Sequence, residues 1–197
     1  MTVVPPRRDT SGPGPLVYKF GGSSLADAGR IVHVANLIAA APTPPVVVVS
    51  AVAGVTDRLA DLVLARTRGE SAAAGSLAEA LSSVHERHRD IARALAPGPA
   101  AGPLLARIDA IVGTVSNDFE GRDETAVRGD PLRGASDADR VRALGEDLSV
   151  ELVVHALRGL GREARVVDAR TVVRTDAAFG SARPNVDAIA EAAAAWL

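Results

Sequence analysis

The chain has 197 residues, enough for one domain with a substantial core, and it is 47% hydrophobic and 23% charged, as globular proteins are. A net charge of −2 and a pI near 6.1 give no electrostatic indication of a nucleic-acid or membrane partner. The absence of cysteine excludes disulfides and thiolate metal sites. The sequence contains neither an apolar run of the ~20 residues that span a membrane nor a signal-peptide core, so we predict a cytoplasmic protein.

The N-terminal residues 1–14 are rich in proline and glycine and are predicted to form a disordered arm. The remaining residues, 15–197, are assigned to one domain. It starts with an apolar, strand-prone run at residues 16–20 that ends in Gly21 and Gly22. In such a strand–turn–helix connection, backbone N–H groups can gather around an anion.

Lys19 stands at the end of this first strand and is the only lysine among the 22 lysine and arginine residues. A compact ammonium suits a transferring phosphoryl group, whereas a planar guanidinium suits a static bidentate pair. Two interpretations are open at this point: a phosphate site, or an ordinary strand end with a glycine turn. The lysine precedes the glycines, so the segment is not a Walker A loop, and it lacks the G-x-G-x-x-G spacing of dinucleotide sites.

The next elements predict a βαβ unit. Ser24 and Asp27 stand at capping-box spacing, so a helix is expected to begin there and to continue to about Ala41. The uninterrupted valines at residues 46–49 predict a strand of a parallel sheet that is buried on both faces. The crossover between the two strands is expected to be right-handed.

The second strand leads into a segment that runs from Ser50 and Ala51 to Thr56. Thr56 is a suitable N-cap for a helix that would continue to about Arg68. Because ligands of open α/β sheets lie outside the carboxyl ends of the strands, both strand–helix loops are expected to line one crevice. A purely structural role is also open, in which Ser50 ends the strand and Thr56 only caps the helix.

Two further helices, at residues 76–95 and 104–115, are predicted to cover the sheet, and residues 117–135 are predicted to be a mobile loop. His85 and His88 lie one helical turn apart. They have no third ligand near them in the sequence, so we predict no metal site.

A long helix is predicted from about Ser136 to Leu160. Glu146 and Ser149 are neighbours on its surface, beside an apolar stripe. Gly145 costs about 1 kcal/mol of helix propensity relative to alanine, which indicates that another group approaches the helix closely there. Glu146 could equally be a solvated surface acid.

The C-terminal part is predicted to contain a strand at residues 163–168, a short β segment at 171–176 and an alanine-rich helix at 185–197. That helix ends on an apolar pair, Trp196 and Leu197. The fold is therefore expected to be incomplete at its C-terminal side.

Four motifs in the same order resemble those of the aspartokinases, members of the amino acid kinase family. The first three are KFGGSS at residues 19–24, VVVSAVAGVTD at 47–57 and GEDLS at 145–149. The fourth consists of RTD at 174–176, FG at 179–180 and ARP at 182–184, and it resembles the monofunctional, lysine-sensitive subgroup. The resemblance covers about residues 16–197.

The resemblance implies a three-layer α/β/α domain with a mainly parallel sheet, the carbamate kinase-like fold of this family. The implied activity is ATP-dependent phosphorylation of the L-aspartate side-chain carboxylate to 4-phospho-L-aspartate, the first step to lysine, threonine and methionine. Family members continue with a glycine-rich GRGGSD motif, an adenine-binding region and usually regulatory ACT domains. These 197 residues hold none of them, so the chain resembles only the N-terminal, substrate- and phosphate-binding part of the kinase domain.

By motif matching, Lys19 is the catalytic residue that would stabilise the transferring phosphoryl group. The residues matched to ATP phosphate binding are Lys19, Phe20, Gly21, Gly22 and Ser23. Those matched to L-aspartate are Ser50, Ala51, Thr56 and Glu146, with the Glu146 carboxylate toward the substrate amine. Mg²⁺ would arrive with ATP, held by phosphate oxygens and water.

Two interpretations from different classes remain: an aspartate kinase, or a non-catalytic half-kinase that acts as partner or regulator of a complete kinase. The presence of Lys19, Thr56 and Glu146 favours the enzyme. The chain on its own is expected to be inactive. It is also expected to form a homo-oligomer or to associate with a complementing chain, because a truncated sheet leaves an edge uncovered.

Overall fold

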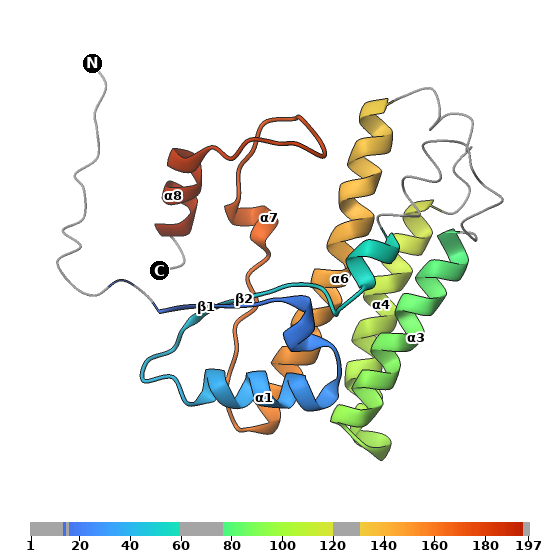
Figure 1. The fold of residues 1–197 in the computed structure, drawn as a ribbon, viewed down its shortest axis with the longest axis vertical. Helices are drawn as coiled ribbons and strands as arrows, with labels where there is room; N and C mark the ends of the chain where they lie inside the picture. The colour runs from blue at the N-terminus through green and yellow to red at the C-terminus, as the bar shows by residue number, and fades with distance from the viewer. Residues whose placement is uncertain (1–13, 15, 60–76, 120–130, 195–197) are drawn as a thin grey trace.

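The computed structural model describes residues 14, 16–59, 77–119 and 131–194 (Figure 1). The predicted arm and the ends of several predicted elements lie outside these ranges, and the division into arm and domain stays a prediction. In chain order the elements are β1 (Val17–Phe20), the 3₁₀ turn η1 (Gly22–Leu25), α1 (Ala28–Ala39), β2 (Val46–Val49), α3 (Leu77–Leu95), the 3₁₀ turn η2 (Gly98–Ala101), α4 (Gly102–Phe119), α6 (Pro131–Gly159), α7 (Ala169–Val172) and α8 (Val186–Ala194).

In the described residues, β1 and β2 form a parallel sheet joined through α1, which confirms the predicted βαβ unit. The pairing runs from Val17 opposite Val46 to Phe20 opposite Val49. One face packs on the core through alternate residues, Tyr18, Phe20, Val47 and Val49.

The other face of this sheet is open. Val17, Val46 and Val48 are 57%, 40% and 49% exposed. The prediction that the valine strand is buried on both faces is therefore wrong for the described part of the chain, in which only the inner face is covered. An apolar run indicates that a strand can be buried on both faces of a sheet. Whether both faces are buried depends on other segments that pack against them.

Both predicted helix starts shift by a few residues. Asp27, not Ser24, is the N-cap of α1, and its carboxylate accepts a hydrogen bond from the Arg30 N–H at 2.9 Å. Ser24 lies in η1, a 3₁₀ turn that precedes the helix. After β2, residues 55–59 are helical, so Thr56 lies inside the first turn and is not the N-cap. The predicted continuation to residue 68 lies outside the described residues.

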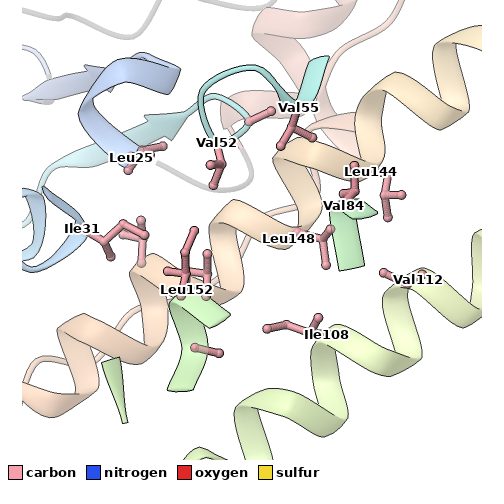
Figure 2. Close-up of a cluster of buried hydrophobic side chains, with 14 of the residues drawn as sticks. Leu25, Ile31, Val52, Val55, Val84, Ile108, Val112, Leu144, Leu148 and Leu152 are labelled. Carbon is pink, nitrogen blue, oxygen red and sulfur yellow. The ribbon is translucent and has the colours of Figure 1, made fainter. Parts of the chain in front are cut away.

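The helices α3, α4 and α6 pack side by side, and α1 contacts α6 and α3 (Figure 1). The α6 stripe predicted from the sequence is buried among the other helices and residues 50–54, the loop after β2 (the β2 loop), as Figure 2 shows. Its members are Val141, Leu144, Leu148 and Leu152. The prediction of a loop at residues 117–135 is wrong at both ends, because α4 continues to Phe119 and α6 begins at Pro131, and residues 120–130 lie outside the described residues.

The C-terminal segment differs most from the prediction. Residues 163–168 are not a strand and pair with no strand in the described residues. The β segment expected at 171–176 is reduced to one antiparallel bridge, between Thr175 and Pro184, after the short helix α7. The predicted last helix is confirmed as α8, which ends at Ala194 in the described part.

His88 is a fully buried polar residue on α3. Its Nδ1–H donates to the Val84 carbonyl at 2.7 Å, while its Nε2 has no hydrogen-bond partner in the described structure. Burial lowers the pKa of His88, and the nearby charges of Arg87 and His85 add to that, against the opposing effect of the Val84 hydrogen bond. The imidazole is therefore neutral in the folded protein at pH 7.

We expect this buried imidazole to make the protein less stable below neutral pH. With a lowered pKa in the folded state, the unfolded chain binds the proton more readily. The free energy of unfolding should therefore fall as the pH drops below the ordinary histidine value of about 6.5. Urea unfolding between pH 7 and pH 5 measures this slope, which should be smaller in His88→Leu. The exposed His33→Leu is the control and should keep the slope. An unchanged slope in His88→Leu would contradict the prediction.

Candidate functional site

The two strand–helix loops lie side by side at the carboxyl edge of the sheet, as predicted. The Ser50 N–H donates to the Phe20 carbonyl at 3.0 Å, so the pairing continues one residue beyond β2. The chain then enters the turn at Gly21 and Gly22 on one side and the loop from Ala51 to Gly54 on the other. Gly54 has φ +77°, a left-handed conformation that favours glycine.

Gly22 is the place where these two loops touch. A Cβ on Gly22 would lie 2.7 Å from the Ala51 carbonyl oxygen and 3.3 Å from the Ala53 Cα. Both neighbours are backbone atoms, which cannot move aside as a flexible side chain can. Gly22 therefore allows the first loop to pack directly on the second.

The helix α6 meets the same loop through Gly145. A Cβ on Gly145 would lie 2.6 Å from the Ala51 Cβ and 3.0 Å from the Val55 Cγ1. The close approach predicted from this mid-helix glycine is therefore present, and the approaching group is the β2 loop. Three sequence motifs meet at one buried alanine, Ala51, with Gly22 on one side and Gly145 on the other.

Two charged side chains beside this junction have no partner among the residues that the structure describes. Lys19 is exposed, and its Nζ lies 4.0 Å from where a Gly21 Cβ would be, so the ammonium folds toward the turn. Glu146 follows Gly145 on α6 and is partly buried. Within the described residues neither Lys19 nor Glu146 makes an ion pair or a side-chain hydrogen bond. In the described structure, the Lys19 ammonium and the Glu146 carboxylate are thus available to a ligand.

The remaining predicted site residues fall into two groups. Ser50 on the β2 loop and Thr56 in the helix that follows it are partly buried, with no side-chain hydrogen bond in the described structure. Phe20 packs its ring on the core, so only its backbone is available to a ligand, and the Ser23 carbonyl accepts from Arg30. Their binding roles stay predictions.

Ser149, predicted to lie beside Glu146 on the helix surface, is instead part of the core. It is buried, and its hydroxyl donates to the Gly145 carbonyl at 2.9 Å. Sequence reasoning also missed the pair between Asp147 and Arg170, two hydrogen bonds of 3.1 Å that tie the C-terminal segment to α6. Two surface residues 23 positions apart carry no sequence signal of such a contact.

Two features, a metal-binding cluster and a membrane-spanning helix, are both absent from the described residues. In this part of the chain, no three His, Cys, Asp or Glu side chains are grouped so that they could hold a metal. None of the helices in the described ranges is both long enough and apolar enough to cross a bilayer.

Comparisons with known proteins agree with this arrangement. Residues 14–197 match the model of the amino acid kinase family. The chain is 31% identical over 172 residues to an aspartokinase of Chlamydia muridarum, covering 87% of this chain and 34% of that protein. It is 30% identical over 182 residues to the lysine-sensitive aspartokinase 3 of Escherichia coli, covering 92% and 37%. The crystal structure of E. coli aspartokinase III with aspartate and ADP superposes with a TM-score of 0.73 at 27% identity and the same coverage.

The chain is therefore a member of the amino acid kinase family, and the resemblance to aspartokinases drawn from its motifs is confirmed. Its fold is the α/β fold of that family, with a sheet that is incomplete in the described residues. The chain spans about a third of the length of the relatives that it matches.

The packing at Gly145 gives a prediction with a matched control. Gly145→Ala gains about 1 kcal/mol of helix propensity but forces a methyl group against Ala51 and Val55, and such overpacking costs about 1–3 kcal/mol. Gly113→Ala on α4 makes the same change in open space and should stabilise by about 0.5–1 kcal/mol. Urea unfolding should show Gly145→Ala to be the less stable of the two variants. Equal stabilisation of both would show that the junction is loose.

Proposed function

We propose that this chain forms the substrate- and phosphate-binding part of an aspartate kinase, which transfers the γ-phosphoryl group of ATP to the side-chain carboxylate of L-aspartate. The observation that carries the proposal is the junction of three motifs at Ala51, with the free charges of Lys19 and Glu146 beside it. The solved relative named above was crystallised with aspartate and ADP, which supports these ligands.

The proposed roles follow from the charges. Lys19 would neutralise the transferring phosphoryl group, while the backbone of Phe20, Gly21, Gly22 and Ser23 would cradle phosphate oxygens. The Gly21–Gly22 turn fits this role because no side chain stands between the Lys19 ammonium and the backbone. Mg²⁺ would come with ATP and neutralise phosphate charge, without a protein cage.

The aspartate side of the proposal rests on α6 and the β2 loop. The Glu146 carboxylate would accept hydrogen bonds from the substrate amine, and Ser50, Ala51 and Thr56 would hold the substrate carboxylates through N–H and hydroxyl groups. The acceptor carboxylate is already ionised at neutral pH, so the reaction needs charge neutralisation and alignment more than a base.

The proposal also includes the cellular location and the assembly of the enzyme. A first step of lysine, threonine and methionine synthesis would take place in the cytoplasm, and a homo-oligomer or a complementing chain would cover the exposed valines of the sheet. The non-catalytic half-kinase has no better support, because the relatives and the solved structure compared above are named as aspartokinases.

Lys19→Arg tests the phosphate role. In a form of the protein that spans the full length of its relatives, this variant should lose nearly all turnover in an acyl-phosphate assay. Its thermal midpoint should hardly change, because the charge is kept and only the shape of the head group differs. Arg158→Lys, an exposed change on α6 at a side chain with no described partner, is the control and should retain activity. More than about a tenth of the wild-type rate, a barrier change under roughly 1.4 kcal/mol, would show that Lys19 is only structural.

Glu146→Gln tests the substrate role in the same full-length form. The variant should raise the KM for aspartate by about one to two orders of magnitude and leave ATP affinity nearly unchanged, because one charge-assisted contact of about 1.5–3 kcal/mol is weakened. The exposed Glu191→Gln on α8 should change neither value. Equal losses for aspartate and ATP would point to a disturbed helix and argue against an amine contact.

A further inference from the structure

A polar hollow lies on the side of the β2 loop that faces α3. It has a volume of about 260 Å³. The loop contributes Gly54, the short helix at residues 55–59 contributes Val55 and Arg58, and α3 contributes Ser83, Val84 and Arg87. Among the described residues, its lining contains two arginines and no acidic side chain. None of the residues assigned above to ATP or aspartate lines it.

The two arginines of this hollow have no partner in the described structure, unlike two other arginines of α3. Arg89 and Arg93, on the same helix as Arg87, pair with carboxylates of Asp109, Glu86 and Asp90. Arg58 and Arg87 make no ion pair and no side-chain hydrogen bond in the described residues. Nor does the Ser83 hydroxyl, so three donor groups border the hollow without an acceptor in the part of the chain that the structure describes.

We propose that this hollow is an anion site that binds a phosphate or phosphomonoester group between Arg58 and Arg87, with the Ser83 hydroxyl as a third donor. Guanidinium groups match phosphate oxygens with two parallel hydrogen bonds each. A tetrahedral phosphate presents oxygens to donors on several sides, whereas a planar carboxylate is satisfied by one guanidinium. The volume is below the ~300–1,000 Å³ of drug-sized pockets, so the group bound is small.

Binding at this site would join the β2 loop to α3. Arg58 and Thr56 lie in the short helix at residues 55–59 that follows the β2 loop, and Arg87 belongs to a helix of the core bundle. Two like charges facing one hollow repel each other, and an anion between them turns that repulsion into attraction. A bound phosphate should therefore stabilise the folded chain beyond the effect of salt alone.

The test uses the 197-residue chain and inorganic phosphate at pH 7.5, with sodium chloride of equal ionic strength as the reference. Calorimetry should show saturable phosphate binding, and the thermal midpoint should rise with phosphate relative to chloride. Arg58→Gln and Arg87→Gln should each weaken binding at least tenfold and remove the rise in midpoint. Arg158→Gln, an exposed arginine on α6, is the matched control and should bind as the wild type does.

Lys19→Ala separates this site from the proposed kinase turn. It should leave the phosphate binding described here unchanged, whatever it does to kinase activity. Loss of binding in Lys19→Ala with retention in both arginine variants would overturn the proposal, because the phosphate would then lie at the turn. Absence of binding in the wild type, an equal effect of chloride, or stronger binding of succinate than of phosphate would overturn it as well.

Discussion

The close approach of Gly22, Ala51 and Gly145 is the constraint on which the arrangement of this chain depends. At this point a turn, a loop and a helix, which are far apart in sequence, come so near that two of them carry only hydrogen as a side chain. An added methyl group on either glycine would meet its neighbour at 2.6–2.7 Å, well inside van der Waals contact. The junction therefore fixes where Lys19 and Glu146 stand relative to the sheet edge, although neither takes part in the contact itself.

The charges around this junction divide into those that hold the fold and those left for other partners. Glu151 is buried on α6, and both of its oxygens accept from Arg107 on α4. Nearer the surface, both carboxylate oxygens of Asp147 accept hydrogen bonds from Arg170. Glu146, which directly precedes Asp147 on the same helix, has no such partner in the described residues. Leaving a partly buried carboxylate unpaired costs stability, and a ligand that supplies the missing cation would remove that cost.

Local features that depend on backbone chemistry could be predicted from the sequence. Features that depend on contacts between distant segments could not. Gly145 was informative because a glycine inside a long helix needs a reason, and the reason is the contact with Ala51. The capping residues were misplaced because Ser24 and Asp27 both suit an N-cap, and only the 3₁₀ turn before α1 selects Asp27. Residues 163–168 have strand composition, but a strand exists only beside a partner, and none pairs with them in the described part. Free side chains such as Arg58 and Arg87 could not be identified either, because pairing is a property of three-dimensional contacts.

The open face of the sheet connects the fold to the proposed reaction. Along β1, Val17 and Lys19 alternate with Tyr18 and Phe20, so the lysine belongs to the face that carries the exposed valines. An ammonium on an open face acts through water, where its attraction for a phosphate is weak. A layer over Val17, Val46 and Val48 would bury apolar surface and also lower the dielectric around Lys19. If the proposed function holds, a layer that completes the hydrophobic packing of the sheet would also strengthen the electrostatic contribution of Lys19, the proposed catalytic residue.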